Sequence, residues 1–167
     1  MNDAHLHLVV NHFPILGTLF GLGILIAGLV LKNKTIANVA YILFIISAVF
    51  GFASMYTGEG AEEMVEDLPS VGDKIIHEHE EMAEKLAVVL YFLGAISIAG
   101  LILNIKNHSK AILVGYLTLA VAIIGAFLGK ETATTGGEVR HTEIRTDRAK
   151  VNATAIGEAK NDAEDKD

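Results

Sequence analysis

Four long stretches without Asp, Glu, Lys or Arg constrain the fold of this chain more than any other feature. They are 28, 24, 20 and 19 residues long, cover 91 of the 167 residues, and lie at 4–31, 35–58, 86–105 and 111–129. A helix needs about 20 apolar residues to cross the hydrocarbon core of a bilayer. The chain therefore has four candidate membrane spans, which excludes a soluble enzyme domain.

Short connections join these spans in two pairs. We place the spans at about 13–31, 36–55, 86–103 and 111–128, so the loop inside each pair has only a few residues. Loops this short require neighbouring helices to be antiparallel. The predicted fold class is all-α, an integral membrane four-helix bundle of two helical hairpins, and this domain occupies residues 1–130.

Lysines in the two short loops predict an orientation. Lys32 and Lys34 lie in the first loop and Lys106 and Lys110 in the second, whereas the twelve residues before Phe13 contain no Lys or Arg. Basic loops remain preferentially on the cytoplasmic side. We therefore expect both termini and the central loop outside the cytoplasm, although five basic residues at 130–150 favour the opposite arrangement.

Most charged residues lie between or after the spans. Between residues 55 and 85 there are ten acids and two lysines, and apolar residues at helical spacing run from Ile75 to Leu90. This pattern predicts that the third helix begins far outside its membrane span, with Ser70 or Asp73 as its cap. We expect an acidic extramembrane helical segment here, a membrane-proximal segment at 131–150 and a disordered polar tail at 151–167.

Histidines are the main candidates for binding a metal or a redox cofactor, because the chain has no cysteine. The net charge of −7 also argues against a nucleic-acid partner, since binding phosphates needs a basic surface. Imidazole is the usual axial ligand of b-type haem and a common ligand of zinc and copper. The predicted topology places six of the seven histidines at the external end: His5, His7, His12, His77, His79 and His141.

The first helix contributes His12 as a predicted ligand. Pro14 either occupies the first turn of a helix, with His12 at the N-terminus of that helix, or kinks a helix that begins near Asp3. His12 is the deepest histidine of this segment on both interpretations. We expect His7 to be a side chain at the membrane interface.

Two further histidines are predicted ligands. His79 falls on the apolar face of the third helix, whereas His77 falls on its charged face. His141 follows Gly136 and Gly137, which allow either a close backbone approach or a sharp turn. Two of His12, His79 and His141 would then hold a haem.

Charged residues near this end extend the candidate site. Glu59 and Glu62 follow the second span, where they would complete a metal site with the histidines or form a solvated helix end. Arg140 and Arg145 would pair with haem propionates or with the acidic central segment. Neither alternative is decided by the sequence.

These residues favour an electron-transfer membrane protein with b-type haem, which exchanges electrons with a quinol or a respiratory-chain protein. One alternative is a zinc or copper site made by the same histidines with Glu59 or Glu62. Another is a non-catalytic structural subunit of a membrane complex. The chain has no recognisable catalytic arrangement, so an electron carrier or binding subunit is a better expectation than a stand-alone enzyme. The oligomeric state is not indicated.

Over about its first 145 residues, the chain resembles a family of small four-helix bacterial membrane proteins with a His-Phe-Pro-Ile signature. The resemblance rests on His7-x4-His12-Phe13-Pro14-Ile15, Thr57-Gly58-Glu59, a histidine before the third span and a Gly-Gly segment after the fourth. The family is classed as a domain of unknown function, and its histidines have invited a b-type cytochrome interpretation. The resemblance implies a protein of the bacterial inner membrane. With the predicted orientation, both of its termini would lie in the periplasm.

Overall fold

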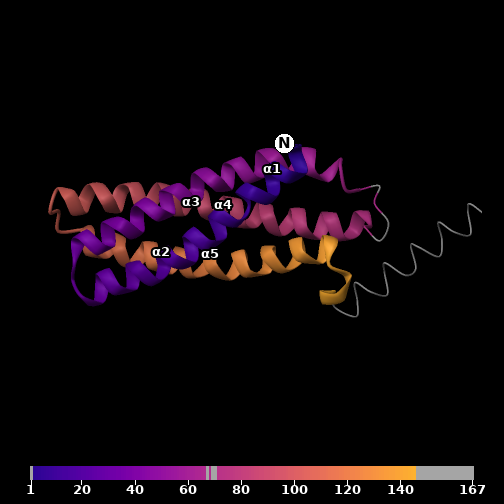
Figure 1. The fold of residues 1–167 in the computed structure, drawn as a ribbon. Coiled ribbons are helices and arrows are strands. Elements are labelled where there is room, and N and C mark those ends of the chain that lie inside the picture. Colours follow the sequence, from indigo (N-terminus) through magenta and orange to yellow (C-terminus); the bar gives the residue numbers. More distant parts are fainter. Residues whose placement is uncertain (1, 67, 69–70, 146–167) are drawn as a thin grey trace, which may run out of the picture.

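The fold consists of four long helices with a short helix at the N-terminus (Figure 1). The structure is a computed structural model and describes residues 2–66, 68 and 71–145. Within them, every regular element is helical. The elements are α1 (Asp3–Val10), α2 (His12–Val30), α3 (Lys34–Glu62), α4 (Asp73–Ile105), α5 (Ala111–Arg140) and the 3-10 helix η1 (Thr142–Ile144).

The two predicted hairpins are present and pack into one bundle. One hairpin is formed by α2 and α3 and the other by α4 and α5, while α3 also packs on α4 and α2 on α5. α1 lies against α3 and leads almost directly into α2. Four helical segments are long and apolar enough to cross a membrane, with α1 and α2 counted together as Asp3–Val30.

Apolar side chains fill the core and also cover the outside of the bundle. Leu25, Phe44 and Leu93 are fully buried, whereas Val49 and Phe127 are each 63% exposed. Water would disfavour an apolar surface of this extent, and lipid would not. The distribution of apolar residues therefore suits a bilayer.

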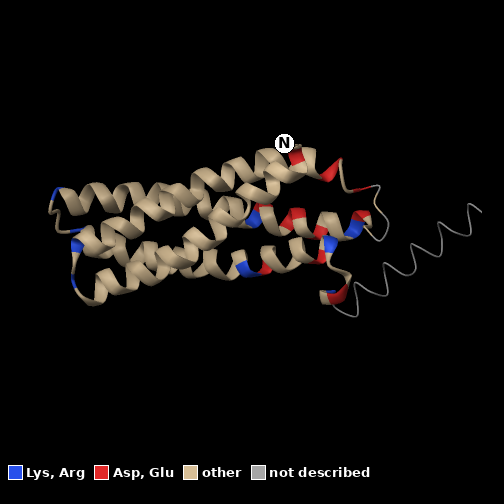
Figure 2. Ribbon diagram, in the orientation of Figure 1, with Lys and Arg blue, Asp and Glu red and all other residues tan. Residues whose placement is uncertain are grey.

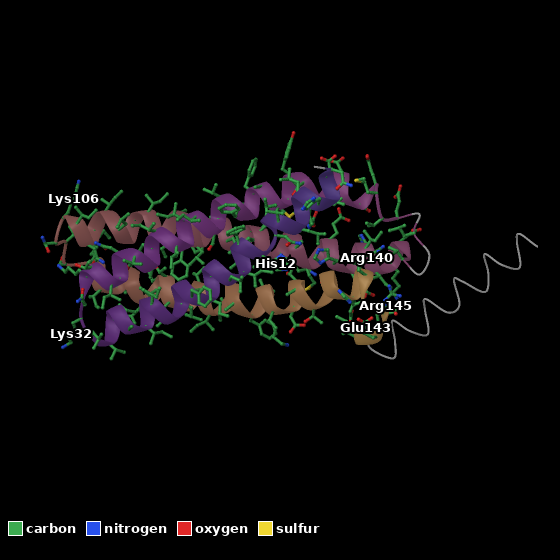
Figure 3. The ribbon with its side chains drawn as sticks, viewed as in Figure 1. His12, Lys32, Lys106, Arg140, Glu143 and Arg145 are labelled. Atoms are coloured by element: carbon green, nitrogen blue, oxygen red, sulfur yellow. The ribbon has the colours of Figure 1, made fainter. Side chains whose placement is uncertain are left out.

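The two ends of the bundle differ in charge (Figure 2). The loops that carry Lys32 and Lys106 lie at one end, and the acidic residues lie at the other (Figures 2 and 3). A hydrogen bond of 2.8 Å from Lys34 Nζ to Asn107 Oδ1 connects the two lysine-bearing loops. The hairpins therefore turn at the same end, as the loop lengths predict.

Several helices extend beyond the predicted spans. α3 continues to Glu62 and α5 to Arg140, so the pair Gly136 and Gly137 lies within a helix instead of a turn. α4 begins at Asp73, but its N-cap is Gly72 and no side chain caps it. Hydropathy falls where a helix leaves the apolar region, yet its backbone hydrogen bonds continue. The tail predicted at 151–167 lies outside the described residues, as does 146–150 of the membrane-proximal segment.

The N-terminal segment combines features of both interpretations of Pro14. Helix begins at Asp3, and a break at Asn11 separates α1 from α2. Proline has no N–H, so Pro14 cannot supply the helical donor for the carbonyl of Val10. The interruption consequently appears one turn before the proline and not at it.

Candidate functional site

The candidate site consists of two histidines at the acidic end of the bundle. His7 of α1 and His79 of α4 are partly shielded from solvent, whereas the other five histidines are exposed. Burial is the main cause that lowers the pKa of both rings below the usual value. The charge of a protonated His7 lowers the pKa of His79 further. Both residues precede the predicted spans, at 13–31 and 86–103.

His7 is held against α3 through its Nδ1 atom. This nitrogen lies 3.1 Å from the carbonyl oxygen of Ser54 and 3.2 Å from Oγ1 of Thr57. A carbonyl oxygen only accepts hydrogen bonds, so Nδ1 must carry the proton in the contact with Ser54. In the neutral ring, Nε2 of His7 therefore has the free lone pair.

His79 is held between α4 and α5. Its Nδ1 atom lies 3.1 Å from Oγ1 of Thr135. The ring also lies against Gly136, where an added Cβ would be only 2.8 Å from Cε1 of His79. The predicted close approach at the glycine pair is therefore present, and it places α5 directly beside a candidate ligand.

Glycine also lies beside His7 on α3. A Cβ added at Gly58 would lie 3.7 Å from Cε1 of His7, which is ordinary contact. At Gly60, an added Cβ would be 2.9 Å from Oδ2 of Asp3, so the absence of a side chain lets the start of α1 approach α3. These two glycines give α1 its place on α3.

The other predicted histidine ligands have different surroundings. His12 is exposed, and its Nδ1 atom donates to the carbonyl of Leu8 on the preceding turn, at 3.0 Å. His141 is also exposed and lies 2.9 Å from a carboxylate oxygen of Glu143. His7 and His79 are thus the half-buried histidines at this end of the bundle, and His7, expected as a side chain at the membrane interface, is held against α3.

Tertiary packing explains why His7 was not among the predicted ligands. Its partners Ser54 and Thr57 lie on α3, far away in the sequence, so the spacing of residues within the first helix does not predict the contact. His7 faces α3, while Leu8 and Val9 are exposed. One sequence signal did include His7, namely the histidine spacing in the resemblance to the His-Phe-Pro-Ile family.

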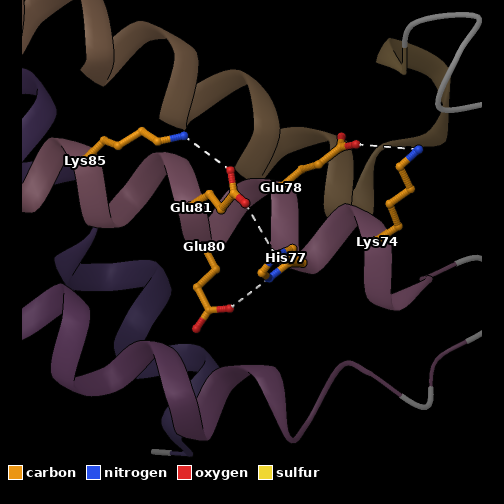
Figure 4. Close-up of polar contacts among 6 residues, drawn as sticks. All are labelled: Lys74, His77, Glu78, Glu80, Glu81 and Lys85. Atoms are coloured by element: carbon orange, nitrogen blue, oxygen red, sulfur yellow. Dashed lines mark hydrogen bonds and ion pairs between the residues drawn. The ribbon is translucent and has the colours of Figure 1, made fainter.

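His77 occupies the charged face of α4, as predicted. Its ring nitrogens lie 3.6 Å from Glu80 and 3.4 Å from Glu81, and Glu81 also pairs with Lys85 at 3.2 Å (Figure 4). These side chains are each at least half exposed. This histidine belongs to a solvated network of ion pairs, and it is a natural control for His79.

The predicted carboxylate ligands Glu59 and Glu62 lie at the end of α3. Glu59 is exposed, and the pKa of Glu62 is raised by partial burial and by the nearby carboxylates of Glu80, Glu66 and Glu59. Glu62 is thus close to the acidic face of α4. Among the described residues, no three His, Asp or Glu side chains are arranged to hold a metal ion.

Arg145 stabilises the end of α5. It is 3% exposed, and its Nε and Nη2 atoms donate to the carbonyls of Glu138 at 2.8 Å and Val139 at 3.2 Å. Such bonds satisfy the last carbonyls of a helix. Arg140 is exposed at the same end of the bundle (Figure 3). The role of either arginine towards a haem propionate stays a prediction.

The site therefore consists of two half-buried imidazoles at the acidic end of the bundle, each oriented by hydrogen bonds through its Nδ1 atom. The resemblance to the His-Phe-Pro-Ile family also stays a prediction. Comparison of the chain with protein-family models, with curated proteins and with solved structures found no match.

Proposed function

We propose that this chain is a membrane electron-transfer protein in which His7 and His79 hold a b-type haem at the acidic end of the bundle. The observation that carries the proposal is that His7 and His79, both half-buried, lie at the same end of the bundle and each has its Nδ1 atom hydrogen-bonded within the protein. Helical bundles commonly hold a cofactor with side chains from different helices. The proposal changes the predicted ligand set, because His7 replaces His12 and His141.

The chemistry of the two side chains fits a haem iron. Neutral imidazole is the form that binds a metal, and the lowered pKa values of His7 and His79 keep both rings neutral at pH 7. Each Nδ1 atom has an oxygen partner in the protein. Metal-binding histidines typically donate their second ring nitrogen to such a partner, which fixes the ring and increases its basicity.

Haem supplies one-electron chemistry when it is bound. The part played by this chain is to hold and orient the two imidazoles and to shield them from water. Ser54 and Thr135 orient the rings, and α3 and α5 provide the shielding. Because four segments are suited to a bilayer, we propose a quinol or a respiratory-chain protein as redox partner in the bacterial inner membrane.

A zinc or copper site would need a different number of protein ligands. Zinc sites usually have three or four protein ligands, whereas axial ligation of haem by imidazoles requires two. The pair His7 and His79 meets the second requirement directly. We therefore favour haem and use metal analysis of the same sample to test the alternative.

The absorption spectrum of the purified, detergent-solubilised chain, before and after dithionite, tests the proposal. We expect sharp Soret and alpha bands on reduction, and we expect His7→Ala and His79→Ala to lose them. His77→Ala and His12→Ala are the matched controls, since each removes an exposed histidine near one of the two ligands.

Two results would contradict the proposal. Absence of the bands after expression with ample haem would exclude b-type haem, and stoichiometric zinc or copper in that sample would support the alternative. Loss of the bands in His12→Ala but not in His7→Ala would instead support the ligand set predicted from sequence.

A further inference from the structure

We infer that Thr135 is a positioning residue that fixes the tautomer of His79, so that this ring presents Nε2 as its only lone pair. The inference rests on the proposed function only where it concerns haem binding. Its geometric basis is independent of any cofactor. No motif in the sequence singled out this threonine.

The hydrogen bonds of Thr135 determine the direction of its contact with His79. The hydroxyl of Thr135 donates to the carbonyl of Thr132 at 3.1 Å, which is one turn earlier on α5. A hydroxyl group has a single hydrogen, so the same oxygen must accept in its second contact. That contact is with Nδ1 of His79 at 3.1 Å, and Nδ1 must therefore carry the proton.

The acceptor of His79 lies where α4 and α5 meet. The carbonyl of Thr132, which receives the Thr135 hydroxyl, raises the pKa of His79 against the larger opposing effect of burial. The hydroxyl oxygen of Thr132 lies 2.9 Å from the carbonyl oxygen of Leu128 on α5 and 3.2 Å from that of Met82 on α4.

The two histidines then have matching tautomers. His7 places its Nδ1 proton on the carbonyl of Ser54, and His79 places its Nδ1 proton on Thr135. A backbone carbonyl orients one ring, and a side chain that can be mutated orients the other. Thr135 therefore offers a way to test the tautomer without removing either imidazole.

The variant Thr135→Val keeps the shape of the side chain and removes the acceptor. Nitrogen NMR of the histidine rings in the full chain, expressed without added haem and measured above pH 7, reports the tautomer directly. We expect His79 to be protonated at Nδ1 in the unmodified chain and to become a mixture of tautomers in Thr135→Val. Loss of the signals in His79→Gln identifies them.

Two further variants separate positioning from general damage. Thr135→Ser keeps the hydroxyl and should restore the original tautomer. Thr134→Val is the matched control, because Thr134 is exposed and its hydroxyl bonds only to the carbonyl of Lys130 at 3.0 Å. A tautomer unchanged in Thr135→Val, or altered equally in Thr134→Val, would overturn the inference.

Haem binding provides a second readout. Loss of the acceptor should weaken haem retention in Thr135→Val by roughly 10- to 100-fold, since partners of ligating histidines have effects of this size. The reduction potential should become more positive, because an imidazole without this acceptor donates less electron density to ferric iron. Thr135→Ser should reverse both changes.

The two readouts also distinguish the two proposals. A chain that binds no haem but changes its tautomer in Thr135→Val refutes the proposed function and retains the positioning role. A chain that binds haem equally well with and without the Thr135 hydroxyl, and keeps its tautomer, refutes only the positioning role.

Discussion

Gly136 and Gly137 are neighbours in α5, but a side chain at each would meet different surroundings. A Cβ at Gly136 would lie 2.8 Å from Cε1 and 3.2 Å from Nδ1 of His79. A Cβ at Gly137 would lie 3.0 Å from Cδ1 of Ile144, the end of a flexible side chain that is 51% exposed. Ile144 has room to move aside, whereas the ring of His79 is held between two helices.

The variant Gly136→Ala should therefore displace His79, while Gly137→Ala should not. We expect Gly136→Ala to weaken haem retention by roughly 10-fold or more, as expected when an oriented ligand is disturbed. Gly137→Ala should retain the spectrum and gain up to about 1 kcal/mol in free energy of unfolding, because alanine favours a helix over glycine. Difference spectra and thermal denaturation measure both effects. Equal spectra for the two variants would contradict the assignment of Gly136.

The contrast between His7 and His79 shows which residues of the site the sequence could predict. His79 lies in one long regular helix, so the apolar periodicity of α4 correctly placed it inside and His77 outside. His7 lies in the short N-terminal helix α1, which packs on α3. Its contact with Ser54 depends on how α1 packs on α3, which is tertiary information.

Helix packing between α2 and α3 depends on a close approach at Gly28. A Cβ there would lie 2.7 Å from the backbone nitrogen and 2.9 Å from Cα of Ala37. At Gly23 of the same helix, an added Cβ would have no neighbour within 4 Å. Backbone atoms cannot rotate away, so a side chain at Gly28 must separate the two helices.

We accordingly expect Gly28→Ala to lower the free energy of unfolding by about 1–3 kcal/mol, the usual range for overpacking. Gly23→Ala should be neutral or stabilising by up to about 1 kcal/mol, through helix propensity alone. Circular dichroism during unfolding in mixed micelles would measure the difference. If both variants unfold alike, the close contact between α2 and α3 is not as described.

α1 buries little surface in the bundle, and one of its contacts with α3 is made by the titratable side chain of His7. Its docking should therefore depend on pH. None of its residues is fully buried, and docking lowers the pKa of His7 by burial, with the charge of His12 acting in the same direction. The released helix would return His7 to its usual pKa of 6.5 and bind a proton more readily. Docking is therefore fully stabilised above pH 6.5 and weakens as the pH falls below it.

Pulsed EPR can measure this release, since the chain has no native cysteine. Nitroxides at His5→Cys and Glu63→Cys, two exposed positions, report the separation of α1 from the end of α3. We expect a broader and longer distance distribution at pH 5 than at pH 7.5. His7→Gln should abolish the pH effect, whereas His12→Gln should largely keep it. A distribution that does not change with pH would refute the role of His7.

The lengths of the helices show what hydropathy alone can and cannot predict. The four charge-free stretches correctly predicted four helices, in two hairpins, that are long and apolar enough to cross a membrane. They did not predict that α3 and α5 continue past residues 55 and 128, because hydropathy reports an apolar environment and not the hydrogen bonding of the backbone. Those polar extensions matter most for function, since they carry Thr57, Thr135 and Gly136.

One end of the bundle carries the lysines of the two short loops, whereas the other carries the acidic residues together with basic residues such as Lys74 (Figure 2). His7 and His79 lie towards the acidic end. Lysine in short loops favours the cytoplasmic side. The opposite end would then face the periplasm, and so would His7 and His79. Orientation thus decides from which compartment a soluble redox partner reaches the site.

Single cysteines can test this orientation. We expect a membrane-impermeant maleimide to label Leu68→Cys, beside the acidic end, in cells whose outer membrane alone is permeable. Ser109→Cys, in the loop between α4 and α5, should react only after the inner membrane is opened. Both positions are exposed, so a difference in labelling reflects the compartment and not burial. The reverse pattern would place His7 and His79 on the cytoplasmic side, where a periplasmic electron carrier could not reach them.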